Sequence, residues 1–81
     1  MDGSFSSDEY DRKGFERCES GDLEGALQIY EEGLAFFPFT PELHAGRGYM
    51  YLYQGEFVNA LASFRSGLTF SPFDPDLNKG A

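Results

Sequence analysis

Residues 21–41, GDLEGALQIYEEGLAFFPFTP, decide the fold, because residues 55–75, GEFVNALASFRSGLTFSPFDP, repeat them at an offset of 34. The offset aligns small, aromatic and proline residues in the same order in both stretches. The identical pairs are Gly21 and Gly55, Ala26 and Ala60, Leu27 and Leu61, Gly33 and Gly67, Leu34 and Leu68, Phe36 and Phe70, Pro38 and Pro72, Phe39 and Phe73, and Pro41 and Pro75. A fixed period of this length is typical of stacked repeats in which each unit is one supersecondary element.

Four helices are predicted, at about residues 7–20, 23–36, 41–54 and 57–70. In the first, second and fourth, apolar and small residues recur at helical spacings of three and four, which places them on one face. These predicted inner faces are Tyr10, Gly14, Phe15 and Cys18 in the first helix; Leu23, Ala26, Leu27, Tyr30 and Leu34 in the second; and Phe57, Ala60, Leu61, Phe64 and Leu68 in the fourth. The expected fold class is all-α, with two stacked helical hairpins and no strand.

Turn and capping residues set the predicted boundaries. Ser6 or Ser7 is expected to cap the first helix, and Thr40 to cap the third, with proline at its first position. Residues 1–6 are expected to be a frayed leader, followed by one unit at 7–40 and a second at 41–74. Residues 75–81 are expected to begin a third unit or to form a C-terminal cap, because they repeat the start of the third helix.

Composition narrows the class of function. The net charge is −8, and it is uneven: residues 1–40 hold ten acidic and three basic residues, and residues 41–81 hold four and three. An acidic surface repels phosphate backbones, so nucleic acid is not an expected partner, and a basic protein or peptide is favoured. A solvated acidic face that only keeps the domain soluble is the open alternative. There is no membrane-length apolar run, no signal peptide pattern and one cysteine, which together favour a cytoplasmic protein.

The spacing of small, aromatic and proline residues resembles the tetratricopeptide repeat, a 34-residue pair of antiparallel helices. The second unit carries the pattern as Gly48, Tyr51, Gly55, Ala60, Leu61, Phe64, Gly67 and Pro72, and the first as Gly14, Gly21, Ala26, Leu27, Tyr30, Gly33 and Pro38. The first unit departs from it at Lys13, where an aliphatic residue is usual, and at Arg17, where the aromatic belongs. In the second unit His44 replaces a bulky apolar residue. The resemblance implies two repeats, about residues 7–77, as a fragment of a right-handed α-solenoid.

The resemblance also implies that the first helix of each unit lines a concave face that commonly holds a peptide. The residues expected on this face are Asp8, Asp11, Phe15, Cys18 and Glu19 from the first unit and Glu42, Ala45, Tyr49, Leu52 and Tyr53 from the second. Some family members grip a partner's C-terminal carboxylate with lysine and asparagine on the first helix. Asp11 and Phe15 stand at those places, so this clamp is not supported.

No catalytic or metal-binding constellation is recognised. His44 is the single histidine and is expected to be structural or exposed, and Cys18 lies near Glu16 and Glu19, which disfavour a thiolate. We therefore expect no enzyme activity, no cofactor and no metal site.

Two functions remain. The first is a protein–protein interaction module, a scaffold or adaptor that binds a peptide or partner segment on the concave face. The second is a structural domain that forms a homo-oligomer through an exposed C-terminal surface. The residues expected at that interface are Phe64, Leu68, Phe70, Phe73 and Leu77.

Overall fold

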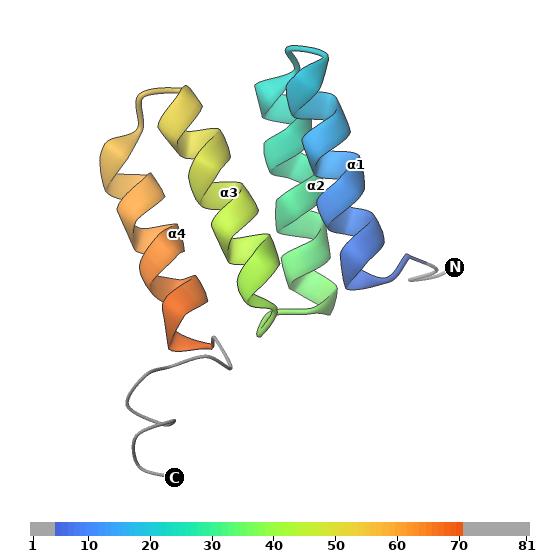
Figure 1. Cartoon of the computed structure of the whole chain (residues 1–81), viewed down its shortest axis with the longest axis vertical. Coiled ribbons are helices and arrows are strands. Elements are labelled where there is room, and N and C mark those ends of the chain that lie inside the picture. The colour runs from blue at the N-terminus through green and yellow to red at the C-terminus, as the bar shows by residue number, and fades with distance from the viewer. Residues whose placement is uncertain (1–4, 71–81) are drawn as a thin grey trace, which may run out of the picture.

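The computed structural model describes residues 5–70, which form four helices joined by short turns (Figure 1). They are α1 (Ser7–Glu19), α2 (Leu23–Phe36), α3 (Pro41–Tyr53) and α4 (Phe57–Thr69). Each lies within one residue of its predicted bounds, and no strand occurs in the described part of the chain. The all-α fold with two stacked helical hairpins is confirmed. Most of the predicted leader and the start of the third unit lie outside the described residues.

The helices pack in chain order. The helix α1 contacts α2 and α3, and α3 lies between α2 and α4. Among the described helices, α4 contacts only α3. The buried core is centred on the first three helices and comprises Tyr10, Ala26, Tyr30, Leu34, Leu43 and Met50. None of the described helices is both long and apolar enough to span a bilayer.

The first helix of each hairpin ends at a glycine turn, as the sequence predicts. Gly21 and Gly55 have φ angles of 90° and 81°, a left-handed conformation that residues with a Cβ atom rarely adopt. Ser6 caps α1 in a capping box, in which its side chain accepts from the Glu9 amide and the Glu9 carboxylate accepts from the Ser6 amide.

The predicted N-cap position of Thr40 is confirmed, but its capping is not made by the side chain. Thr40 does occupy the N-cap position of α3, but its side chain accepts no hydrogen bond from the helix. The Thr40 carbonyl instead accepts from the amides of Leu43 and His44, at 3.1 and 3.4 Å. Pro41 at the first helical position has no N–H to satisfy, which reduces the need for a cap.

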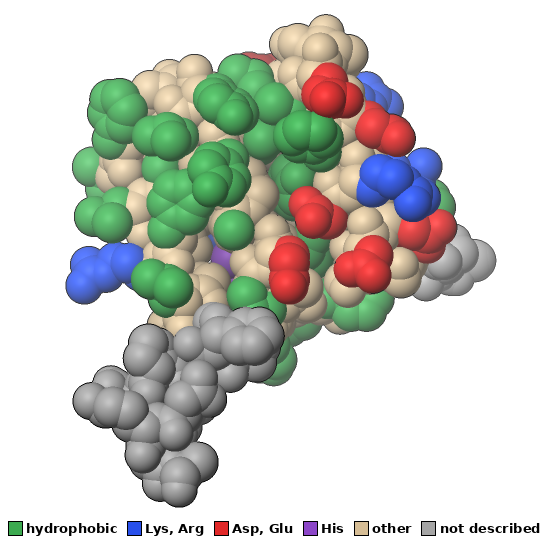
Figure 2. Space-filling model, viewed as in Figure 1, with side chains coloured by type: hydrophobic (Ala, Val, Ile, Leu, Met, Phe, Trp, Pro, Cys, Tyr) green, Lys and Arg blue, Asp and Glu red, His purple; other side chains and the backbone are tan. Residues whose placement is uncertain are grey.

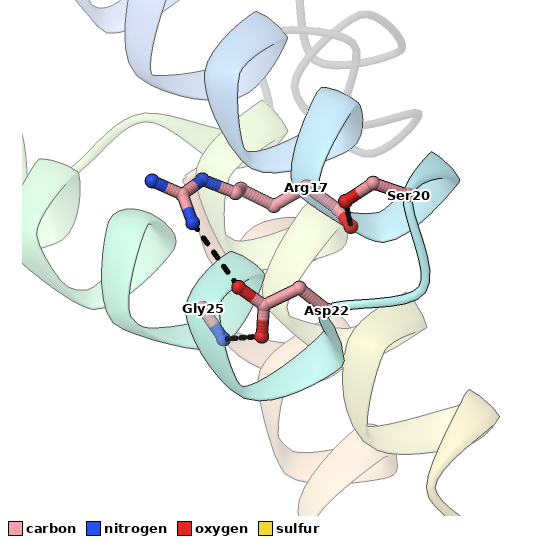
Figure 3. Close-up of polar contacts among 4 residues, drawn as sticks. All are labelled: Arg17, Ser20, Asp22 and Gly25. Atoms are coloured by element: carbon pink, nitrogen blue, oxygen red, sulfur yellow. Dashed lines mark hydrogen bonds and ion pairs between the residues drawn. The ribbon is translucent and has the colours of Figure 1, made fainter.

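Arg17 makes an ion pair at the turn between α1 and α2. The Arg17 guanidinium lies 3.1 Å from the Asp22 carboxylate, whose other oxygen accepts the Gly25 amide at 2.9 Å (Figure 3). Asp22 is the N-cap of α2, so one carboxylate both caps this helix and pairs with α1. Its equivalent in the second hairpin, Glu56, makes no such cap.

The predicted inner face of α4 is only partly buried. Ala60 is buried and Phe64 is half-buried, but Phe57, Leu61 and Leu68 are exposed. This corrects the prediction for Phe57 and Leu61, whereas the exposure of Leu68 agrees with its expected place on an exposed C-terminal surface. The physical reason lies in the packing order. The helix α2 is covered by α1 on one side and α3 on the other, whereas in the described part of the chain α4 has only α3 beside it.

Gly48 faces α4 at close range, as the sequence predicts. A Cβ atom at this position would lie 2.8 Å from the Phe64 ring. We therefore expect Gly48→Leu to overpack the second hairpin and to lower the free energy of unfolding by about 1–3 kcal/mol. Thermal denaturation measures this change. Ala62→Leu, which adds apolar atoms at an exposed position of α4, serves as the control. A Gly48→Leu chain that melts at the wild-type temperature would contradict the contact.

Candidate peptide-binding groove

An open groove of about 440 Å³ runs along the first helices of the two hairpins. Its lining comes from α1, from α3 and from one residue of α2. The lining residues are Asp11, Phe15, Tyr30, Glu42, Ala45, Gly46, Tyr49, Met50 and Tyr53. Hydrophobic side chains gather over α3 and α4 on the face shown in Figure 2, and charged side chains gather over α1.

The two walls of the groove are α1 and α3. Tyr30 from α2 sets the distance between them. Its side chain is only 1% exposed. One edge of the ring faces Gly14 of α1, where a Cβ atom would lie 2.5 Å from the ring, and the other edge faces Gly46 of α3, where a Cβ atom would overlap the ring. Two glycines on different helices therefore make room for one aromatic ring, which holds α1 and α3 at a fixed separation.

The Tyr30 hydroxyl is hydrogen-bonded to α1. It donates to the Asp11 carboxylate at 2.9 Å and lies 3.1 Å from the Asp11 carbonyl oxygen. Burial, and next the hydrogen bond to Asp11, raise the pKa of Tyr30 above its ordinary value, so the hydroxyl stays protonated and remains a donor. The bond also fixes one Asp11 carboxylate oxygen at the edge of the groove.

Three aromatic side chains give the groove its apolar surface. Phe15 from α1 and Tyr49 and Tyr53 from α3 each leave half or more of their surface exposed. The Tyr49 ring is supported edge-on by Phe64, with ring centroids 5.1 Å apart and planes at 76°. Rigid, half-exposed aromatic rings provide contact area at a small cost in conformational entropy, as in many protein interfaces.

The charged groups of the groove are all acidic. Asp11 and Glu42 supply carboxylates from opposite walls, and no lysine, arginine or histidine is among the lining residues. A cleft lined by one sign of charge attracts ligand groups of the opposite sign. The arrangement therefore favours a ligand with basic groups placed next to apolar side chains.

Five of the eight residues predicted for partner binding line this groove: Asp11, Phe15, Ala45, Tyr49 and Tyr53. The other three do not line it. Cys18 packs partly buried against the core, Glu19 is the exposed last residue of α1, and Leu52 is exposed near the end of α3. Of the two further residues expected on the concave face, Glu42 lines the groove and Asp8 does not.

The sequence reasoning missed three lining residues, Tyr30, Gly46 and Met50. Tyr30 was expected on the inner face of its helix, but not at a binding surface. Gly46 did carry a signal, because Gly46 and Gly48 stand two positions apart and hence on nearly opposite sides of a helix. A helix packed on both sides needs small residues on both faces. Here Gly46 faces α2 and Gly48 faces α4.

The residues predicted for a homo-oligomer interface divide into three groups. Leu68 is 71% exposed on α4, and Phe64 is half-buried against Gly48 and Tyr49. Phe70 is 38% exposed, and its ring packs against its own chain, with ring centroids 5.0 Å from Phe39 and 5.6 Å from His44. Phe73 and Leu77 lie outside the described residues.

His44 has a structural role in the second hairpin. It is buried, its Nε2 atom lies 2.8 Å from the Pro38 carbonyl oxygen, and its ring stacks on Phe70. His44 thus joins α3 to the turn that precedes it. This agrees with the expectation that it is structural or exposed. Within residues 5–70, no group of three or more histidine, cysteine or acidic side chains lies close enough together to hold a metal ion.

No family model, no curated protein and no solved structure matches this chain.

Proposed function

We propose that the chain is a non-catalytic interaction module of the tetratricopeptide type, which binds a basic segment of a partner protein in the groove between α1 and α3. One observation carries the proposal. The groove combines half-exposed Phe15, Tyr49 and Tyr53 with the carboxylates of Asp11 and Glu42, on two helices held apart by a buried ring. Apolar anchors and complementary charge together are the features of a protein-recognition surface.

The chemistry of the groove suggests how the segment would be held. Leucine or aromatic side chains of the partner would pack on the tyrosine and phenylalanine rings, and lysine or arginine side chains would approach the two carboxylates. The aromatic contacts would contribute most of the affinity, because buried aromatic anchors dominate interfaces of this kind. The carboxylates at the open edge would mainly raise the association rate and set the preference for basic over acidic segments.

An array of short synthetic peptides tests this proposal. The peptides have equal length and equal apolar content and differ only in carrying basic, neutral or acidic residues. We expect the basic set to bind best and to weaken as salt is added. Tyr53→Ala should reduce the affinity of the best peptide at least about tenfold. Val58→Ala, at an exposed position of α4 outside the groove, should leave it unchanged.

Two results would contradict the proposal. The first is a best-binding set that is acidic. The second is an affinity that Tyr53→Ala and Val58→Ala alter equally, since that would place the bound peptide elsewhere on the chain.

A further inference from the structure

The helix α4 carries a stripe of apolar side chains, and α3 is the one helix beside it within residues 5–70. Phe57, Leu61, Phe64 and Leu68, here called the α4 stripe, are spaced by four, three and four residues. Phe57, Leu61 and Leu68 are 66%, 57% and 71% exposed. This spacing is the one by which a helix packs along another helix in a coiled coil. The α4 stripe is therefore suited to a helical partner.

The first hairpin shows how the positions equivalent to the α4 stripe are covered. The equivalent residues of α2, 34 positions earlier, are Leu23, Leu27, Tyr30 and Leu34. Tyr30 and Leu34 are only 1% and 8% exposed, because α1 and α3 both pack against α2, and the Tyr30 ring lies between them. The sequence repeat thus supplies an internal example in which the same positions are covered by a neighbouring antiparallel helix.

Head-to-tail stacking of a second copy is disfavoured by the surface of α1. The residues by which α3 meets α2 include Leu43, Gly46 and Met50. Their equivalents in α1, 34 positions earlier, are Glu9, Arg12 and Glu16. Stacking α1 of one copy on α4 of another would bury these charged side chains against Leu61 and Leu68, at a large desolvation cost.

The charge distribution favours α4 itself as the partner helix. The chain has 14 acidic residues, yet residues 57–69 include none, and Arg65 is their single charged residue. Two copies with a net charge of −8 each repel one another, and α4 is the helix through which they can approach without bringing carboxylates together. The α4 stripe also presents a continuous apolar surface that matches itself.

We propose that two copies of this chain pair through the α4 stripe, about a two-fold axis that sets the two α4 helices antiparallel. In this arrangement Phe57 of one copy packs against Leu68 of the second copy, and Leu61 packs against Phe64. The contact is isologous, so the same surface serves both copies and the assembly closes as a dimer. Phe64 of the stripe packs against the groove residue Tyr49, so the dimer contact borders the groove. The proposal is argued from the residues of α4 and does not rest on the function proposed above.

Mass measurement by sedimentation equilibrium over a concentration series tests the dimer. We expect the wild-type chain to shift from monomer to dimer as its concentration rises. Leu61→Glu and Leu68→Glu, both at exposed positions, should each raise the dissociation constant of the dimer by about tenfold or more, because a carboxylate would be buried without a partner. Asn59→Glu adds the same charge on the opposite side of α4 and should leave the dissociation constant within about threefold of wild type.

A mixing experiment tests the antiparallel geometry. Phe57→Lys and Leu68→Glu chains should each be monomeric alone at the concentration where the wild type is half dimeric. An equimolar mixture should form a heterodimer, because one contact becomes a lysine–glutamate pair and the other remains Phe57 against Leu68. A wild-type chain that stays monomeric at millimolar concentration would overturn the proposal. So would a dimer that Leu61→Glu and Leu68→Glu leave intact.

Discussion

Replacing Tyr30 with alanine is expected to remove a large share of the free energy of unfolding of the chain. The ring is 1% exposed and fills the space between Gly14 and Gly46, and the backbone of those glycines cannot move inward without breaking the packing of two helices. Removal of a buried aromatic side chain costs about 3–5 kcal/mol. A domain of this size has a total stability of the order of 4–12 kcal/mol, so the loss is a large share of it.

Circular dichroism during urea denaturation measures the effect of Tyr30→Ala. Tyr53→Ala is the matched control, because it makes the same chemical change at a tyrosine that is mostly exposed. We expect the control to fold as the wild type does and to lose peptide binding. Equal stability of the two variants would show that Tyr30 does not hold α1 and α3 together.

Gly46→Leu should be the most damaging of the glycine substitutions on α3. A Cβ atom at Gly46 would overlap the Tyr30 ring, and this ring is confined on its other edge by Gly14 and at its hydroxyl by Asp11. At Gly48 the neighbouring ring belongs to half-buried Phe64, which has more freedom to move aside. We therefore expect Gly46→Leu to lower the free energy of unfolding by at least about 3 kcal/mol, more than Gly48→Leu does.

A double-mutant cycle identifies the cause of the Gly46 effect. Gly46→Ala should cost clearly less in a chain that also carries Tyr30→Leu than in the wild type, because the smaller side chain leaves room for the new methyl group. If the two substitutions lower the free energy of unfolding additively, the two positions are not in contact, and the Tyr30 ring does not set the width of the groove.

The helices of this chain could be predicted closely from the sequence, and the contacts between them less closely. The 34-residue repeat and the turn glycines Gly21 and Gly55 are local signals, so the helix bounds agree with the structure to within one residue. Periodicity also gives the buried face of α2. It gives no information on whether a neighbouring element covers that face, and for that reason Phe57 and Leu61 of α4 were wrongly expected on a buried inner face.

The groove was predictable where the expected concave face coincides with it, as at Tyr49 and Tyr53. It was not predictable at Tyr30, whose position depends on glycines 16 residues away on either side in the sequence. Arg17, which stands where the repeat pattern has an aromatic residue, is another position that could not be predicted. Its ion pair with Asp22 depends on how two helices meet at a turn, and a repeat pattern read one unit at a time does not contain that information.

Perturbation of backbone amide resonances tests whether the groove between α1 and α3 is the binding surface. The ¹⁵N-labelled chain would be titrated with the best basic peptide of the array. We expect the largest shifts at Asp11, Phe15, Ala45, Tyr49 and Tyr53, and little shift at residues 58–62 of α4. Largest shifts on α4, with an unperturbed groove, would contradict this expectation.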